Sequence, residues 1–223
     1  MTTTSTAVYD AHADWYENYI SGGGDYLQRV HAIAKDLLGT GEGPCLDICC
    51  GTGAHTRVPA GLGWTPLGVD LSGGQLRHAS GRLPVAQADA TALPVADSSL
   101  PAAMCVLSST DMPDYPAMLR EVTRVLRPGG RFVHVGVHPC FVGAFADWSQ
   151  SPRVAIDARY ADRSRSFDSW NTGGVRVRVG AWHVPLADLL NATVTAGLRL
   201  IRVAEAGPGG VPDLFAFLAI RER

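Results

Sequence analysis

CLDICCGTGAHT, residues 45–56, decides the fold of this chain. Six mostly apolar residues come first, and Gly51-Thr52-Gly53 follows them. A short apolar run that ends in glycines is typical of a buried parallel strand that turns sharply into a helix. Because glycine lacks a Cβ atom, the backbone can bend there and a ligand can approach it closely. The stretch therefore predicts a strand, a tight turn and a ligand-binding site together.

An acidic residue follows at the distance that a nucleotide-binding fold requires. Residues 67–71, LGVDL, indicate a second strand with Asp70 near its end, 19 residues after Gly51. In Rossmann-type folds the first strand ends in a glycine turn, and an acid after the second strand binds the ribose hydroxyls. The chain is therefore expected to bind a ligand that contains adenosine.

The glycine spacing separates two classes of cofactor. A dinucleotide-binding turn has the pattern G-x-G-x-x-G, whereas the last position here is Thr56. Asp47 would lie beside the pyrophosphate of NAD, where a carboxylate is unfavourable, but it suits the α-ammonium group of a methionine moiety. The Tyr-x-x-x-Lys pair of many oxidoreductases is also missing, since Lys35 is the only lysine. An NAD-dependent oxidoreductase is therefore the less favoured alternative.

Asp47-Ile48-Cys49-Cys50-Gly51-Thr52-Gly53 resembles motif I, D-x-G-C-G-T-G, of the class I S-adenosylmethionine-dependent methyltransferases that act on small molecules (the type 11-like domain). Cys49 stands where the family usually has glycine. The resemblance covers about residues 45–135. Three further segments continue it in order, namely a motif II-like stretch, an adenine-binding segment, and a helix with a Pro-Gly-Gly turn and the fifth strand: 68–72, 87–94 and 119–132. The resemblance implies S-adenosyl-L-methionine as the cofactor.

The resemblance also implies which residues contact that cofactor, since ligands of open α/β sheets lie at the carboxyl ends of the strands. Asp70 would hold the ribose, Asp89 the adenine amino group, and the Ala90 amide a ring nitrogen. An N-terminal helix in this family often closes over the cofactor. The expected cofactor-binding residues are Asp47, Cys49, Gly51, Gly53, Asp70, Leu71, Asp89, Ala90, Ser108, Tyr16 and Tyr19.

The rest of the chain fits a single α/β domain, residues 1–223. Strands that alternate with helices from 45 to 137 predict a Rossmann-like, doubly wound sheet, which in this family has seven mostly parallel strands. Residues 1–40 predict an N-terminal helical cover. Residues 139–174 lack periodicity and predict an insertion after the fifth strand that serves as a lid over the acceptor pocket.

The C-terminal part predicts further regular elements. Valine and arginine alternate strictly over 175–179, a pattern that is typical of a half-buried strand. A helix and two antiparallel strands follow it, at 185–196, 198–205 and 214–221. The N-terminal cover is expected to consist of helices at 7–20 and 25–39.

Proton removal from the acceptor would need a base, and imidazole is the natural candidate because it titrates near neutral pH. His138 follows the fifth strand and His183 precedes the helix at 185, so these two are the expected catalytic residues. No metal site is expected, since Asp111 and Asp114 lack a matching Asn at the next strand. Large aromatic residues are expected to line the substrate pocket: Phe141, Trp148, Trp170 and Trp182.

Composition limits the partners. A chain of 223 residues with 46% hydrophobic content can bury a substantial core. A net charge of −2 offers no basic field for nucleic acid. The sequence has no apolar run long enough to span a bilayer and no signal peptide at its start. Its five cysteines show no C-x-x-C spacing. A cytoplasmic protein that binds neither nucleic acid nor membrane is expected.

The sequence therefore predicts S-adenosylmethionine-dependent methyl transfer to a small molecule, of the kind found in secondary metabolism. Whether oxygen, nitrogen or carbon receives the methyl group stays open. A homodimer is one explanation for the aromatic residues of the insertion. The alternative is a protein that binds the cofactor but catalyses another step, or that acts as a binding module, because a fold does not determine its chemistry.

Overall fold

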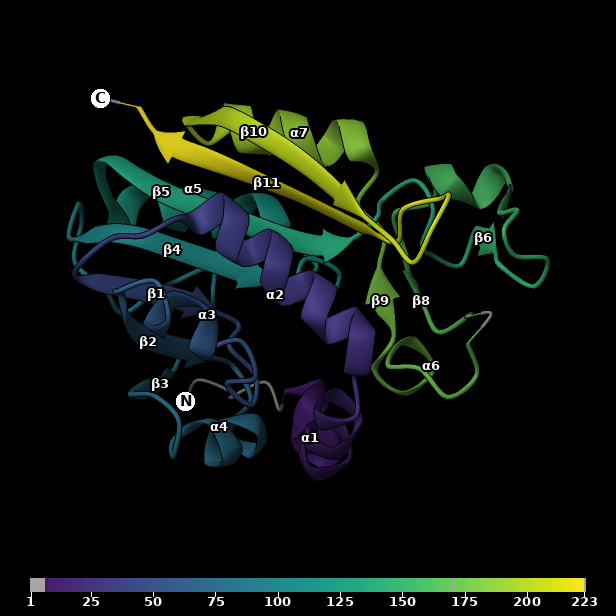
Figure 1. The fold of residues 1–223 in the computed structure, drawn as a ribbon, viewed down its shortest axis with the longest axis horizontal. Coiled ribbons are helices and arrows are strands. Elements are labelled where there is room, and N and C mark those ends of the chain that lie inside the picture. The colour runs from purple at the N-terminus through teal and green to yellow at the C-terminus, as the bar shows by residue number, and fades with distance from the viewer. Residues whose placement is uncertain (1–6, 170, 223) are drawn as a thin grey trace, which may run out of the picture.

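The computed structural model describes residues 7–169 and 171–222, and one seven-stranded sheet forms its centre (Figure 1). The strands lie in the order β10-β11-β5-β4-β1-β2-β3. Strands β1 to β5 are parallel, whereas β11 runs antiparallel to both β5 and β10. This is the Rossmann-like sheet that the sequence predicts. Its strands are β1 (Pro44–Ile48), β2 (Thr65–Asp70), β3 (Val85–Gln87), β4 (Leu100–Val106), β5 (Leu126–Val137), β10 (Leu198–Ala206) and β11 (Leu214–Arg221).

Helices cover both faces of the sheet. On one face α2 (Gly24–Leu38) packs over β4, β5 and β11, and α3 (Arg57–Ala60) lies beside α2 and β2. The apolar residues of α2 recur at helical spacing, which explains why this segment forms a one-sided helix. On the other face lie α5 (Tyr115–Val125) and α7 (Leu186–Thr195). The helix α4 (Gly73–Ala79) packs beside β2 and β3.

The N-terminal cover is helical, as predicted, but it begins with a 3-10 turn. This turn, η1 (Val8–His12), leads into α1 (Ala13–Ser21). Polar contacts attach the cover to α4. Asp10 accepts hydrogen bonds from Ser72 Oγ at 2.6 Å and from Gly74 N at 3.0 Å. Glu17 pairs with Arg82 at 2.5 Å. The cover is therefore fixed next to the loop that follows β2.

The insertion after β5 is largely irregular, as predicted. It contains only short elements, which are β6 (Ala146–Asp147), β7 (Ala155–Ile156), η2 (Ala158–Ala161) and β8 (Arg165–Ser166). Strand β8 pairs with β9 (Ala181–Trp182). Figure 1 shows β8, β9 and α6 (Arg176–Val179) gathered at the end of the sheet to which the arrows of β4 and β5 point.

The strand expected over 175–179 is wrong, because this segment forms the single helical turn α6. Alternation over five residues is a weak signal, and the structure gives the segment no neighbouring strand in the described residues. Only Val179 is buried, and Gly180 ends the turn with φ +67°. Contacts with η1 therefore take the place of a ladder of hydrogen bonds.

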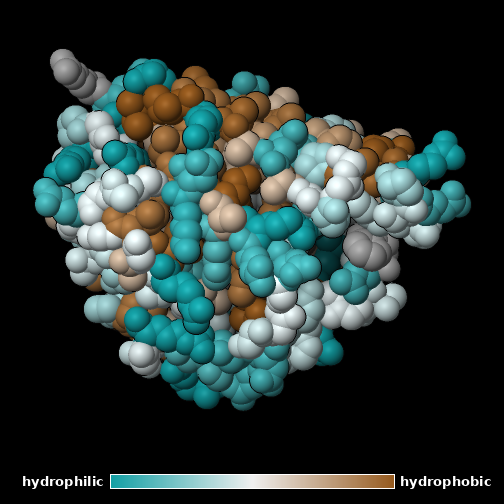
Figure 2. All heavy atoms as spheres, viewed as in Figure 1, coloured by the Kyte–Doolittle hydropathy of each residue, from teal (hydrophilic) through white to brown (hydrophobic). Residues whose placement is uncertain are grey.

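Two surface features complete the fold. Strand β10 lies at one edge of the sheet, and its Ile201 and Val203 are 45% and 54% exposed. Figure 2 shows apolar residues gathered in the upper part of this face, where Figure 1 places β10 and β11. Among the described residues, no helix is both long and apolar enough to cross a membrane.

Candidate active site

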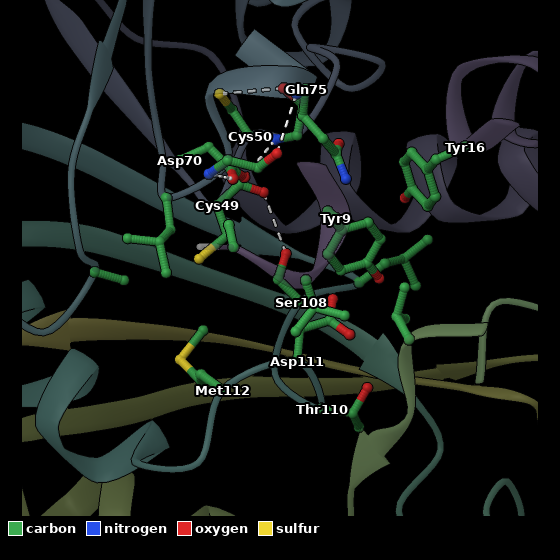
Figure 3. Close-up of a pocket in the computed structure, with 18 of the residues that line it drawn as sticks. Tyr9, Tyr16, Cys49, Cys50, Asp70, Gln75, Ser108, Thr110, Asp111 and Met112 are labelled. Carbon is green, nitrogen blue, oxygen red and sulfur yellow. Dashed lines mark hydrogen bonds between the residues drawn. The ribbon is translucent and has the colours of Figure 1, made fainter. Parts of the chain in front are cut away.

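Two adjoining cavities lie at the carboxyl ends of the parallel strands. The first has a volume of about 300 Å³ and is lined by the segments that follow β1, β2 and β4 (Figure 3). The second has about 710 Å³ and lies between the N-terminal cover, the start of α2 and the insertion. Six residues line both, and they are Tyr9, Tyr16, Leu107, Thr110, Asp111 and Gly180. The cavities therefore meet at a shared wall.

The turn after β1 shapes the first cavity. Gly51 has φ +54°, and a Cβ there would lie 2.6 Å from Gln75 Oε1, so a side chain at this position would fill the space beside the turn. Cys49 replaces the family's glycine and still adopts φ +58°. For a residue other than glycine this left-handed conformation costs about 1–2 kcal/mol. Leu107, after β4, has φ +59°. Backbone strain thus gathers where the walls form.

Asp70 is the central polar group of this cavity. Its carboxylate accepts hydrogen bonds from Gly51 N at 2.9 Å and from Ser72 N at 2.8 Å. Each carboxylate oxygen has a second lone pair, so Asp70 can accept from the two hydroxyls of a ribose as well. Burial raises the pKa of Asp70 above its ordinary value, although the two amides oppose this shift.

The loop after β3 forms another side of this cavity. Asp89 Oδ1 accepts from the backbone and hydroxyl of Thr91 at 2.8 Å and 2.7 Å. Asp89, Ala90 and Thr91 all line the first cavity. The loop is therefore held in a fixed shape by its own side chains where it lines the cavity.

Buried polar groups without partners lie around the glycine turn. Asp47 is 1% exposed, and neither of its oxygens has a hydrogen-bond partner in the described residues. Burial, with a contribution from Asp70, raises the pKa of Asp47 well above its usual range. Thr52 Oγ1 and Gln75 Oε1 are orphaned too, and both residues line the cavity. Buried polar atoms are normally hydrogen-bonded, so these residues fit a polar ligand such as S-adenosylmethionine.

The structure brings most of the expected cofactor residues together. The first cavity is lined by Cys49, Gly51, Asp70, Leu71, Asp89, Ala90, Ser108 and Tyr16. Asp47 and Gly53 are not among its described lining residues, and Tyr19 lines the second cavity instead. Contact between these residues and the cofactor stays a prediction.

The four residues expected to line the substrate pocket do not all line one cavity in the structure. Trp148 lines the second cavity, and its indole Nε1 donates to Phe141 O at 2.6 Å. Trp182 lines the first cavity. Phe141 lines neither cavity in the described residues and packs against the His138 ring, with 4.6 Å between centroids. Trp170 lies outside the described residues.

His138, the first expected base, occupies a structural position. It is 2% exposed and belongs to neither set of described lining residues. Its Nε2 lies 2.7 Å from Glu205 Oε1, and its Nδ1 accepts from Cys140 N at 3.1 Å. Because both ring nitrogens already have protein partners, this geometry does not support the expected base.

His183, the second expected base, is also outside both sets of described lining residues. Its ring packs between Phe145 and Tyr160, with centroid distances of 4.5 Å and 5.2 Å. Burial lowers the pKa of His183 to about 4, so the ring is neutral at pH 7. The chain therefore places it among aromatic side chains rather than at the shared wall.

Sequence reasoning considered Asp111 only as a metal ligand, although it lies at the junction of the cavities. Asp111 is exposed to the open cavity, yet desolvation by the protein packed around its carboxyl group raises its pKa to about 7. Tyr9 donates a hydrogen bond to it. The available signal is an acid five residues after the end of the fourth strand. In the described chain, no group of three acidic, His or Cys side chains could hold a metal.

Known proteins resemble this chain in the same region. A family described as "Methyltransferase domain" matches residues 46–134. A probable phthiotriol/phenolphthiotriol dimycocerosates methyltransferase of Mycobacterium ulcerans is 36% identical over 58% of this chain and 51% of its own length. A demethylmenaquinone methyltransferase of a Mycobacterium species (strain JLS) is 36% identical over 57% of this chain and 56% of its own length. The chain thus spans about half the length of these relatives.

The fold comparison agrees. The crystal structure of an S-adenosylmethionine-dependent methyltransferase from Mesorhizobium loti matches with a TM-score of 0.70 and 24% identity, covering 91% of this chain and 100% of that one. Together, the glycine turn, the acid after β2 and the sheet order define a Rossmann-like domain. Residues 46–134 of this chain match the methyltransferase-domain family, and its fold is the one found in S-adenosylmethionine-dependent methyltransferases.

Proposed function

We propose that this chain transfers a methyl group from S-adenosylmethionine to a small molecule bound in the second cavity. The observation that supports this is that six residues line both cavities. An acceptor in the second cavity would therefore lie next to a ligand in the first and could reach it without crossing solvent. A volume of about 710 Å³ lies in the usual range for small-molecule pockets. The relatives' names specify small-molecule acceptors, a phthiotriol and a demethylmenaquinone.

Cofactor binding is assigned to the first cavity. Asp70 would hold the ribose hydroxyls, the loop of Asp89 and Ala90 the adenine, and the segment around Gly51 the methionine part. When bound, S-adenosylmethionine supplies a methyl group that its sulfonium charge already activates. The chain's own contribution is then alignment and exclusion of water.

The insertion and the N-terminal cover are proposed as the walls of the acceptor site. Tyr19 and Ile20 from α1 line the second cavity opposite Trp148 and Ser151 of the insertion. We propose residues 139–174 as a lid over this cavity. Phe167 of the insertion is 51% exposed, and a second copy of the chain is the proposed partner for it, which size-exclusion chromatography can test.

Calorimetric titration tests the proposal. We expect micromolar binding of S-adenosylmethionine and S-adenosylhomocysteine, no comparable binding of NADH, and loss of binding in Asp70→Ala. Binding of NADH alone would contradict the cofactor assignment.

Methyl transfer itself is tested with acceptors such as reduced demethylmenaquinone. We expect S-adenosylhomocysteine to appear in a one-to-one ratio with methylated product. Conversion of an acceptor without consumption of the cofactor would instead support the alternative, a methyltransferase-fold protein that catalyses another step.

A further inference from the structure

We propose that Asp111 is the catalytic base, and that it removes the proton from a hydroxyl group on an aromatic acceptor. This inference rests on the methyl-transfer function proposed above. Asp111 lies in the loop after β4, where its backbone N donates to Ser108 O at 3.0 Å. That bond fixes the loop directly beyond the strand end. Figure 3 shows Asp111 beside Ser108 and Thr110 at the edge of the cavity.

Position distinguishes Asp111 from the other titratable side chains. Among the described residues, the titratable groups that line both cavities are Tyr9, Tyr16 and Asp111. Burial raises the pKa of both tyrosines, so neither phenol ionises near neutral pH. Asp111 is therefore the group at the junction that can accept a proton from an acceptor.

The surroundings of Asp111 adjust its basicity. The Tyr9 hydroxyl, from η1, donates a hydrogen bond to the carboxylate, and Asp70 repels its negative charge. Arg176 of α6 and Arg165 of β8 attract that charge. Burial outweighs these attractions and raises the pKa of Asp111 to about 7. A base is most effective when its pKa lies near the working pH, so the balance suits proton removal.

The lining of the second cavity indicates the class of acceptor. Tyr19, Tyr26 and Trp148 line it, together with apolar side chains such as Ile20 and Val142. Aromatic side chains favour planar rings through offset or edge-to-face packing. Two cationic side chains, Arg29 and Arg176, line it too. Arg29 forms an ion pair with Asp213 at 2.8 Å, which leaves Arg176 as the cation beside Asp111. A ring that becomes phenolate-like near Arg176 fits these groups.

The proton and electrons balance in a single step. The O–H bond of the acceptor breaks, its proton moves to a carboxylate oxygen of Asp111, and the O–H electron pair stays on the acceptor oxygen. An electron pair of that oxygen forms the new bond to the methyl carbon, while the pair of the carbon–sulfur bond returns to sulfur. Asp111 afterwards releases the proton to solvent through the open cavity.

A phenol probe tests the position of Asp111 without any turnover. The probe is 4-nitrophenol, which ionises near neutral pH, and its non-ionisable control is 4-nitroanisole. With wild-type protein the affinity for 4-nitrophenol should fall about tenfold or more between pH 6 and pH 8.5, because two negative charges then meet at the junction. In Asp111→Asn this fall should shrink to less than about threefold. The affinity for 4-nitroanisole should change little in either protein.

The matched control is Asp114→Asn, three residues away. Asp114 caps α5 by accepting from Ala117 N at 2.8 Å, and asparagine can keep this cap. This variant should behave like the wild type. Equal pH dependence in wild type and Asp111→Asn, or no binding of the probe, would overturn the inference. Binding of S-adenosylhomocysteine, measured in parallel, reports separately on the proposed function.

Discussion

The proposed cofactor cavity and the proposed acceptor cavity of this protein are built in different ways. The first cavity is lined largely by turns that follow β1, β2, β3 and β4, all within the span that matches known methyltransferases. The second is lined by side chains from η1, α1, α2, the insertion and the loop before β11, and most of these lie outside that span. The cavity proposed for the cofactor is thus built from local motifs, whereas the cavity proposed for the acceptor is built from segments that only the fold brings together.

The largest expected effect concerns the cofactor region. Asp70→Ala should weaken S-adenosylhomocysteine binding by about 100-fold or more, since hydrogen bonds to a charged group contribute about 1.5–3 kcal/mol each. Isothermal titration calorimetry measures this change. Asp36→Ala, which removes only a surface ion pair with Arg202, is the control and should bind normally. Equal affinities in the two variants would remove Asp70 from the cofactor site.

Turnover of the Asp111→Asn variant tests the role of the carboxylate at the wall that the two cavities share. With an acceptor that the wild type methylates, kcat should fall about 100-fold near pH 7, because general-base catalysis contributes about 10²–10⁴-fold. The deficit should shrink at high pH, where the acceptor ionises by itself. A full pH profile with Asp114→Asn as control separates this from general damage. A constant deficit at every pH would indicate misalignment rather than a lost base.

The variant His138→Ala tests whether His138, which lines neither cavity in the described residues, contributes to stability only. His138→Ala should lower the free energy of unfolding by about 1–3 kcal/mol, since it leaves the Cys140 amide and Glu205 without their partner. Urea denaturation measures this loss. Turnover per folded molecule should change less than threefold, and His183→Ala should behave alike. A 100-fold loss of turnover with unchanged stability would restore the imidazole as the base.

The raised pKa of Asp111 also predicts a gain in stability on its removal. A carboxyl whose pKa is about 7 in the folded protein and near its ordinary value when unfolded is ionised more readily in the unfolded chain. The resulting penalty grows as the pH rises from about 4 to 7. Asp111→Asn should therefore raise Tm at pH 8, and less so at pH 5, in a thermal melt. A lower Tm at pH 8 would show that the carboxylate stabilises the fold.

The smallest effect concerns the attachment of the N-terminal cover. Glu17→Gln should weaken the contact with Arg82 by less than about 1 kcal/mol, because the pair lies near the surface. A hydrogen bond from Arg82 lowers the pKa of Glu17 to about 2, so this contribution is present above pH 4.5 and is lost as the pH falls toward 2. Hydrogen exchange over residues 8–21 should accelerate in the variant. Glu222→Gln, at a surface pair with Arg199, should leave that exchange unchanged.

Expectations held best where backbone geometry follows from a few neighbouring residues. The strand before Gly51 and the α2 helix with its end at Gly39 are predicted correctly because apolar periodicity and glycines specify them locally. The segment 175–179 was mispredicted because five alternating residues do not determine whether a partner strand exists. His138 was favoured as a base from its place after β5, but Glu205 on β10 occupies its Nε2.

The sequence by itself determined the strand before Gly51, the glycine turn and the acid at the end of β2, because each depends on residues close together in the chain. Only the tertiary structure decided which side chains meet at the shared wall. Tyr9 and Asp111 are about 100 residues apart, yet they form a hydrogen bond, and Arg176 faces them from a third segment. The physical reason is that a cavity's polarity and the pKa values of its groups depend on what packing brings near, and no local pattern records this.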